Sequence, residues 1–111
     1  MNTPDKWIVI KITNKNEKPL YKVFSSWYGG YLGSDSWKMN SGIKSIDIHE
    51  DDYIDFIGYS GSVYRCVIGC YGTNLYSQGV LNNIIETGKK NNFTVEILPE
   101  NTDWNKLLEI D

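Results

Sequence analysis

The fold is decided by the stretch WIVIKIT at residues 7–13. Its isoleucines recur at every second position, so all three lie on one face of an extended strand. This alternation predicts a strand with one face buried. A second strand at residues 20–27 follows a polar turn at residues 14–19, and the two strands are expected to pair as a hairpin.

The rest of the chain continues in short segments of the same kind. Further strands are expected at residues 43–48, 53–58, 62–68 and 92–98, with a helix at residues 78–87 and a short final helix after residue 101. The connections are mostly short, which favours antiparallel pairing. The sequence therefore predicts an α+β fold: a mainly antiparallel twisted sheet of about six strands, with one or two short helices packed on one face.

Both expected helices carry apolar side chains at helical spacing. In the first they are Val80, Leu81, Ile84 and Ile85. In the second they are Trp104, Leu107 and Leu108. Side chains at this spacing share one face of a helix, so both helices are expected to dock on the sheet. Gly88 is expected to stop the first helix.

Length and charge restrict the kind of protein. The 111 residues fit a single domain, residues 1–111, because no break in composition and no internal repeat divides them. The net charge of -3 argues against direct binding of nucleic-acid phosphates, which needs a basic face. No apolar run approaches the ~18 residues of a membrane span, and the chain does not start like a signal peptide. A cytoplasmic location in a bacterial host cell is expected.

The composition indicates an AT-rich genome. The chain has no Ala, a single Arg, and many residues with AT-rich codons, Ile, Asn, Lys and Tyr. In size, composition, mild acidity and lack of a catalytic set it resembles the small accessory proteins of phages and mobile elements. These include anti-defence proteins such as anti-CRISPRs, and immunity proteins that block toxins. The resemblance implies a protein that binds and inhibits another protein.

No set of residues matches a catalytic or metal-binding motif. Cys66, Cys70 and His49 are three potential ligands at most, whereas structural zinc sites usually use four. Residues 58–62 approach a nucleophile elbow, but a strand-like segment follows where a helix is required. We therefore expect free thiols, no metal, no cofactor and no catalytic residues, which means that the protein is not an enzyme.

Aromatic side chains gather in a segment rich in Gly and Ser. Four aromatic residues lie within eleven positions of one another: Trp27, Tyr28, Tyr31 and Trp37. Residues 28–42 are expected to form a long loop. Trp and Tyr are common hot-spot residues of interfaces, so Tyr28, Tyr31 and Trp37 are candidates for partner binding. Two interpretations stay open, because the rings could instead fold back and fill the core.

Carboxylates gather in a second segment. They are Asp47, Glu50, Asp51, Asp52 and Asp55. Their spacing does not match a calcium-binding loop. They indicate either a solvated turn or a docking site for a basic partner surface, for which Glu50, Asp51 and Asp52 are the candidate residues.

Taken together, these features predict a small non-enzymatic intracellular protein that inhibits a protein partner with a basic surface. The alternative is a protein that binds or sequesters a small ligand such as a nucleotide. In that case the rings of the aromatic Gly-rich loop would stack on the base.

Overall fold

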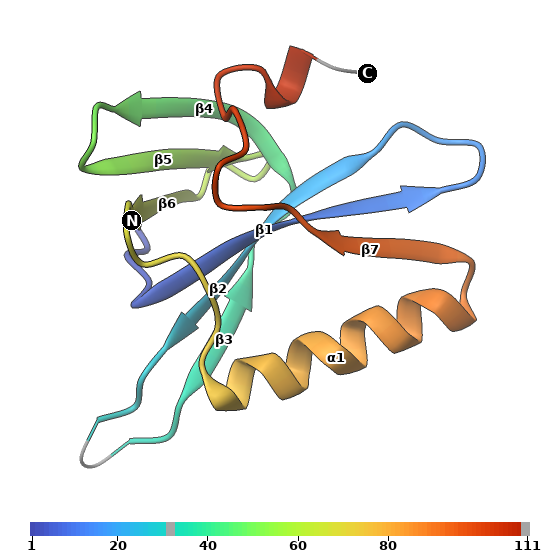
Figure 1. The fold of residues 1–111 in the computed structure, drawn as a ribbon, viewed down its shortest axis with the longest axis horizontal. Helices are drawn as coiled ribbons and strands as arrows, with labels where there is room; N and C mark the ends of the chain where they lie inside the picture. Colours follow the sequence, from blue (N-terminus) through green and yellow to red (C-terminus); the bar gives the residue numbers. More distant parts are fainter. Residues whose placement is uncertain (31–32, 110–111) are drawn as a thin grey trace.

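The α+β class is confirmed by the computed structural model, which describes residues 1–30 and 33–109 (Figure 1). The described residues form seven strands, one α-helix and a 3-10 turn. In chain order these are β1 (Lys6–Asn14), β2 (Leu20–Trp27), β3 (Ser36–Met39), β4 (Ile43–His49), β5 (Tyr53–Gly58), β6 (Val63–Val67), α1 (Leu75–Lys90), β7 (Phe93–Ile97) and η1 (Leu107–Glu109).

The strands divide into two antiparallel sheets, whereas the sequence analysis expected one. The larger sheet has the order β3-β2-β1-β7 and the smaller one the order β4-β5-β6. The chain leaves the larger sheet after β3 and turns at Gly42, whose φ of 128° is the left-handed kind that glycine adopts readily. The next strand, β4, therefore starts a new sheet instead of extending the first.

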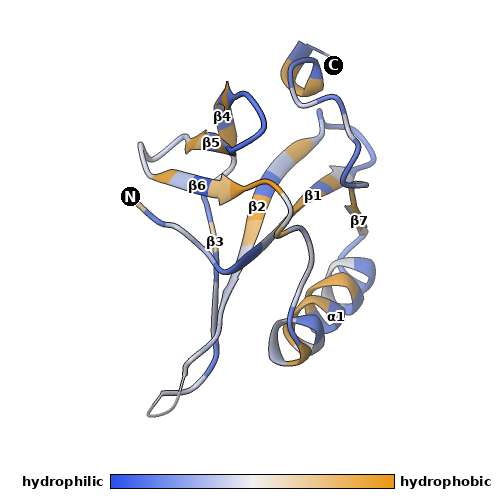
Figure 2. Ribbon diagram, turned by 60° about the vertical axis from the view of Figure 1, so that its left-hand side comes forward, coloured by the Kyte–Doolittle hydropathy of each residue, from blue (hydrophilic) through white to orange (hydrophobic). Residues whose placement is uncertain are grey.

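The four-stranded sheet is the middle layer of the molecule, with α1 on one side and β4–β6 on the other (Figure 1). Ile8 and Ile10 face the helix and pack with Phe24 and Leu81. Trp7 faces the second sheet and belongs to a different core cluster. Figure 2 shows apolar segments on the strands of both sheets and along α1. β1 is therefore buried on both faces over its first half, and not on one face as expected.

The helix α1 is longer at both ends than predicted. Its N-cap is Asn74, whose side-chain oxygen accepts a hydrogen bond from the Ser77 backbone N–H at 2.8 Å, while the Ser77 hydroxyl accepts one from the Asn74 N–H at 2.9 Å. This reciprocal capping box starts the helix one turn early. Gly88 does not stop it; the lack of a side chain there lets the helix approach Val95 on β7.

The expected final helix is reduced to the 3-10 turn η1, at Leu107–Glu109. Trp104 and Leu107 are buried as the spacing predicted, whereas Leu108 is exposed. In the described part of the chain, no helix combines the length and the apolar character that crossing a membrane requires.

Tyr71 joins the central strand β1 to the segment that follows β7. Its hydroxyl accepts a hydrogen bond from the Val9 backbone N–H at 3.2 Å and donates one to the Leu98 carbonyl. Burial is the main reason why the pKa of Tyr71 is raised from 10.0 to about 12. The folded protein therefore holds this phenol proton more tightly than the unfolded chain does.

Alkaline pH is expected to destabilise the protein through Tyr71. Since its pKa is higher in the folded state, its contribution to stability is complete below about pH 10 and is lost as the pH rises to about 12. Urea denaturation at about pH 8 and about pH 11 should show a larger loss of stability in the wild type than in Tyr71→Phe. Burial also raises the pKa values of Tyr64 and Cys66. Both residues are present in the wild type and in Tyr71→Phe, so their effect cancels in the comparison. Equal losses would contradict the prediction.

Candidate functional site

The segment expected as a long loop contains a strand. β3 pairs with the end of β2, with Trp37 opposite Ser26, so the loop prediction is wrong for Ser36–Met39. The Trp37 ring stacks on Phe24, with centroids 5.5 Å apart and planes 21° apart. The strand has only four residues and is flanked by glycines and serines, so its alternation of apolar and polar side chains is too short to recognise in the sequence. These residues form a strand because they pair with β2.

The aromatic candidates are therefore in different situations. Tyr28 is 54% exposed at the end of β2, and its backbone N–H donates to the Asp5 carboxylate at 2.8 Å. Trp37 is partly exposed, and one face of its ring is covered by Phe24. Tyr31 lies outside the described residues. Trp27, at the start of the segment, packs against the core, and its indole N–H donates to the Thr3 carbonyl at 3.1 Å.

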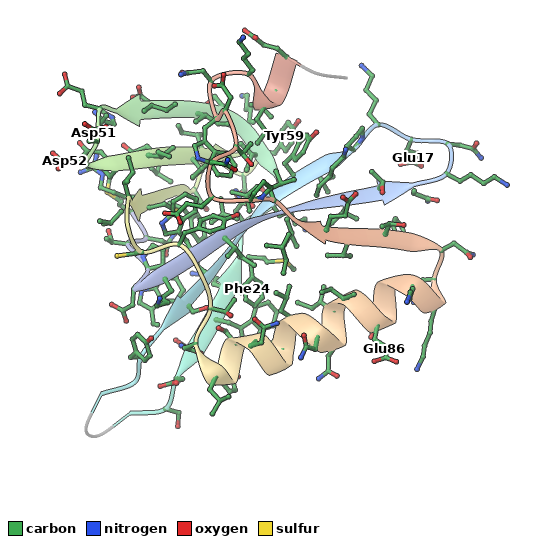
Figure 3. All side chains as sticks on the ribbon, viewed as in Figure 1. Glu17, Phe24, Asp51, Asp52, Tyr59 and Glu86 are labelled. Atoms are coloured by element: carbon green, nitrogen blue, oxygen red, sulfur yellow. The ribbon has the colours of Figure 1, made fainter. Side chains whose placement is uncertain are left out.

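The carboxylate-rich segment forms the turn between β4 and β5, and its members also differ. Glu50, Asp51 and Asp52, which we call the acidic turn, are exposed. Figure 3 shows Asp51 and Asp52 at this turn, away from the β2–β3 hairpin that carries the aromatic candidates. The two groups of predicted binding residues are therefore separate surfaces.

The other two carboxylates belong to a polar network on the outer face of β4–β6. Asp55 is buried and accepts two hydrogen bonds from Arg65, from Nε and from one terminal guanidinium nitrogen, both at 2.9 Å. This pairing raises the pKa of Arg65. His49 Nε2 lies 3.2 Å from Asp47 and 3.6 Å from Asp55, and its ring stacks on Tyr53. Arg65 covers the Tyr53 ring at 4.0 Å. These groups are engaged with one another.

The two cysteines differ in burial: Cys66 is buried and Cys70 is half-buried. Cys66 and Cys70 are both free thiols. Burial raises the pKa of the Cys66 thiol, so it stays protonated and a poor nucleophile at neutral pH. Within residues 1–30 and 33–109, no three His, Cys, Asp or Glu side chains come together as a metal site.

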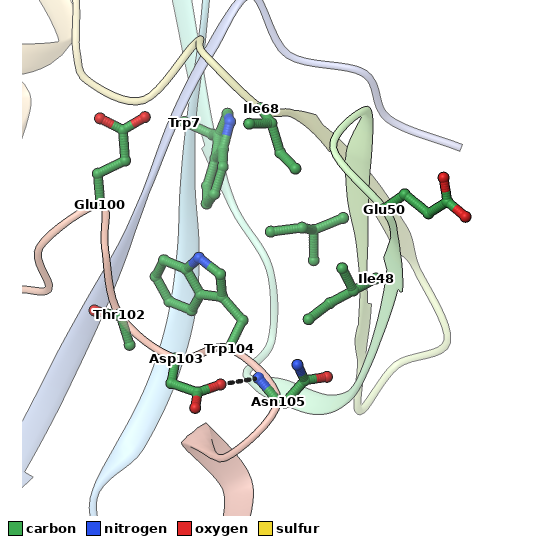
Figure 4. A pocket seen from close by; sticks show the side chains of 10 residues that line it. Trp7, Ile48, Glu50, Ile68, Glu100, Thr102, Asp103, Trp104 and Asn105 are labelled. Carbon is green, nitrogen blue, oxygen red and sulfur yellow. Dashed lines mark hydrogen bonds between the residues drawn. The ribbon is translucent and has the colours of Figure 1, made fainter.

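A pocket of about 290 Å³ opens beside the acidic turn, between the β4–β5 hairpin and the segment that follows β7 (Figure 4). We call it the indole pocket. Its apolar lining consists of Trp7, Ile48, Ile54, Ile68 and Trp104. Its polar lining consists of Glu50, Glu100, Thr102, Asp103 and Asn105. Of these residues, sequence analysis had named only Glu50 as a binding candidate.

The two indoles give the pocket a rigid wall. Their ring centroids are 5.9 Å apart, and Trp7 and Trp104 are 2% and 8% exposed. The indole N–H of Trp7 donates to the Val67 carbonyl at 2.8 Å, so this buried donor is already satisfied. Figure 4 shows the indoles on one side of the pocket, with Ile48 and Ile68 across from them. The wall therefore offers apolar contact and is held in place by the core.

The polar lining of the indole pocket is acidic. Glu50 comes from the acidic turn, while Glu100 and Asp103 come from the segment after β7. The lining contains no Lys, Arg or His, and among the described residues none of these three carboxylates forms an ion pair. Asp103 accepts a hydrogen bond from the Asn105 backbone N–H at 3.2 Å. The pocket thus combines an apolar interior with unneutralised negative charge.

Comparison of the chain with known proteins finds no match among family models, curated proteins or solved structures.

Proposed function

We propose that this protein is a small non-enzymatic inhibitor that binds a protein partner with a basic surface. The observation that carries the proposal is the acidic turn, whose three carboxylates are exposed beside two further ones, Glu100 and Asp103. The chain has 14 acidic residues, and five of them lie at the acidic turn or line the indole pocket. Such a surface attracts a basic partner and orients it on approach.

Binding, and not catalysis, is also supported by the reactive groups. The most deeply buried thiol, Cys66, is kept protonated by its surroundings. His49, the one imidazole in the chain, lies against Asp47 and Asp55, and none of its described contacts is with a hydroxyl or a thiol. A nucleophile activated by an adjacent base needs a contact of that kind.

The proposed setting is a phage or mobile element acting in the cytoplasm of a bacterial host. Support comes from the small size of the chain and from a composition rich in AT-encoded residues. The inhibited partner would then be a host defence protein, as for an anti-CRISPR, or a toxin, as for an immunity protein. Many such partners act on nucleic acids, and the basic surface needed for that task is complementary to an acidic inhibitor.

Neutralising the acidic turn is expected to slow association with the partner. Tagged protein captures the partner from the native host, and binding kinetics are then compared for the wild type and Glu50→Gln/Asp51→Asn/Asp52→Asn. At low salt we expect association to be about tenfold slower in the variant, with little change in dissociation, because exposed charges act mainly during approach. The difference should shrink as salt rises, since the screening length falls to about 8 Å at physiological ionic strength.

A matched variant controls for net charge. Glu17→Gln/Glu86→Gln/Glu96→Gln removes the same charge from exposed sites elsewhere, and Figure 3 shows Glu17 and Glu86 on the side of the molecule away from the acidic turn. Its association rate should stay close to that of the wild type. A wild-type association rate that does not depend on salt, or an equal loss in both triple variants, contradicts the proposal.

Nucleotide binding by the β2–β3 hairpin is the alternative, and the exposure of Tyr28 favours it. A thermal-shift assay with a panel of nucleotides separates the two functions, because a ligand that binds only the folded state raises the melting temperature. A shift with one nucleotide that disappears in Trp37→Ala supports the alternative over inhibition of a protein.

A further inference from the structure

We infer that the indole pocket receives one bulky apolar side chain of the partner, and that Lys or Arg residues next to this side chain in the partner pair with the carboxylates at the rim. This inference rests on the proposed function and specifies the chemistry of the partner segment. That segment is short and basic, with a single apolar anchor.

The apolar anchor follows from the shape and lining of the pocket. A volume of about 290 Å³ lies at the small end of ligand pockets and suits one large side chain. Two indoles and three isoleucines line the interior. Interfaces draw most of their affinity from anchors of this kind, which fill a preformed pocket and exclude water.

The basic neighbours follow from the position of the charges. In Figure 4 the carboxylates of Glu50, Glu100 and Asp103 lie around the edge of the pocket and not between the indoles and the isoleucines. Glu50 stands on one side, and Glu100 and Asp103 stand on the other. A Lys or Arg side chain of the partner that entered the apolar interior would lose its water without reaching a carboxylate. Lys or Arg side chains next to the apolar anchor reach the carboxylates at the rim while they stay partly hydrated.

The backbone at Glu50 agrees with a role for its carboxylate. Its φ of 50° lies in the left-handed region, which Gly or Asn adopts more easily than Glu does. The turn itself needs no carboxylate: it is closed by the hydrogen bond from the Asp52 backbone N–H to the His49 carbonyl, at 3.1 Å. A Glu at this position therefore contributes charge to the rim at some conformational cost.

Three blocked peptides separate the anchor from the charge: Lys-Lys-Leu-Lys-Lys, the same peptide with Ser in place of Leu, and the Leu peptide with Glu in place of every Lys. Titration calorimetry gives the affinities, and NMR shows which residues respond. We expect the Leu peptide to bind with shifts around Ile68 and Trp104, the Ser peptide to bind at least tenfold more weakly, and the Glu peptide not to bind. Equal affinities for the Leu and Ser peptides would overturn the inference.

Two variants of the protein test the pocket itself. Ile68 is 39% exposed, so Ile68→Ala removes part of the wall without opening the core, and Glu100→Gln removes a rim charge. We expect Ile68→Ala to weaken the Leu peptide about fivefold and leave the Ser peptide unchanged, and Glu100→Gln to weaken both. Ile97→Ala and Glu86→Gln are matched controls, because Ile97 is 45% exposed on β7 and Glu86 is exposed on α1. Controls that weaken the peptide as strongly as the pocket variants would overturn the inference.

The same experiments distinguish failure of this inference from failure of the proposed function. If Ile68→Ala and Glu100→Gln bind the Leu peptide like the wild type, while neutralising the acidic turn still slows association with the protein partner, the inference fails and the function stands. If the pocket variants lose the peptide but the turn variant associates normally, the pocket chemistry holds and the function fails. Competition by tetramethylammonium at the concentration of the peptide would mean that the pocket recognises a lone cation, which overturns the anchor.

Discussion

Replacing Trp104 with Ala is expected to lower the free energy of unfolding by about 3–5 kcal/mol. The ring is 8% exposed and meets three other rings, with centroids 5.9 Å from Trp7, 5.8 Å from Phe56 and 6.3 Å from Tyr71. It belongs to the segment after β7, outside the strands. Without the indole, this segment loses its main attachment to the two sheets, and a cavity opens at the end of the indole pocket. Urea denaturation measures the loss.

Trp37→Ala is the control, because it removes the same side chain from an exposed position on β3. Trp37 stacks on Phe24 but is 37% exposed, so we expect a loss below about 2 kcal/mol. A loss below about 2 kcal/mol for Trp104→Ala as well would mean that the segment after β7 is not an integral part of the core.

Six of the seven strands, and the pairing of β1 with β2, were predictable because their signals are local. The alternation at residues 7–13 places a strand where β1 is observed, and the polar residues between β1 and β2 give the hairpin. The helix α1 was also found, with Leu81 buried and Asn82 exposed as its periodicity requires. These features depend on neighbours within about one turn or one hairpin, which a single sequence contains.

The second sheet was not predictable from the same pattern. Trp7 and Val9 are apolar, but Lys11 and Thr13 on the same face of β1 are not, so the face looks mixed in sequence. In the structure, β4–β6 cover only the first half of that face, where Trp7 and Val9 lie. Which part of a mixed face is covered depends on contacts between distant segments, and these leave no local periodicity.

The candidate site was also predictable only in part, where its signals are local. The acidic turn was found, because a run of carboxylates between two strands belongs to a solvated turn. The indole pocket was not predicted, since Glu50 and Glu100 are 50 positions apart and line one pocket only when the segment after β7 folds over the smaller sheet. A helix was expected to start just after residue 101, yet the 3-10 turn begins at Leu107. The signal available was a large ring that follows two acids, since Trp104 comes directly after Asp103 and four positions after Glu100.

Replacing Leu81 with Ala is expected to lower the free energy of unfolding by about 2–5 kcal/mol. The side chain has no exposed surface and packs with Ile8, Ile10 and Phe24, so it is the main contact between α1 and the larger sheet. Asn82→Ala, one position along the helix, faces solvent and should change stability by less than about 0.5 kcal/mol. A comparable loss at both positions would show that the helix docks with a different face.

The double variant Leu81→Ala/Trp104→Ala tests whether the two layers of the core are independent. Leu81 and Trp104 belong to separate clusters on opposite faces of the four-stranded sheet. Sites without shared partners add within about 0.5 kcal/mol, so the loss in the double variant should equal the sum of the single losses. The side chain that could couple them is Tyr71, which packs against both clusters. A departure from additivity that disappears in the Tyr71→Phe background would identify the Tyr71 hydroxyl, which bonds to Val9 and Leu98, as the connection between the helix and the indole pocket.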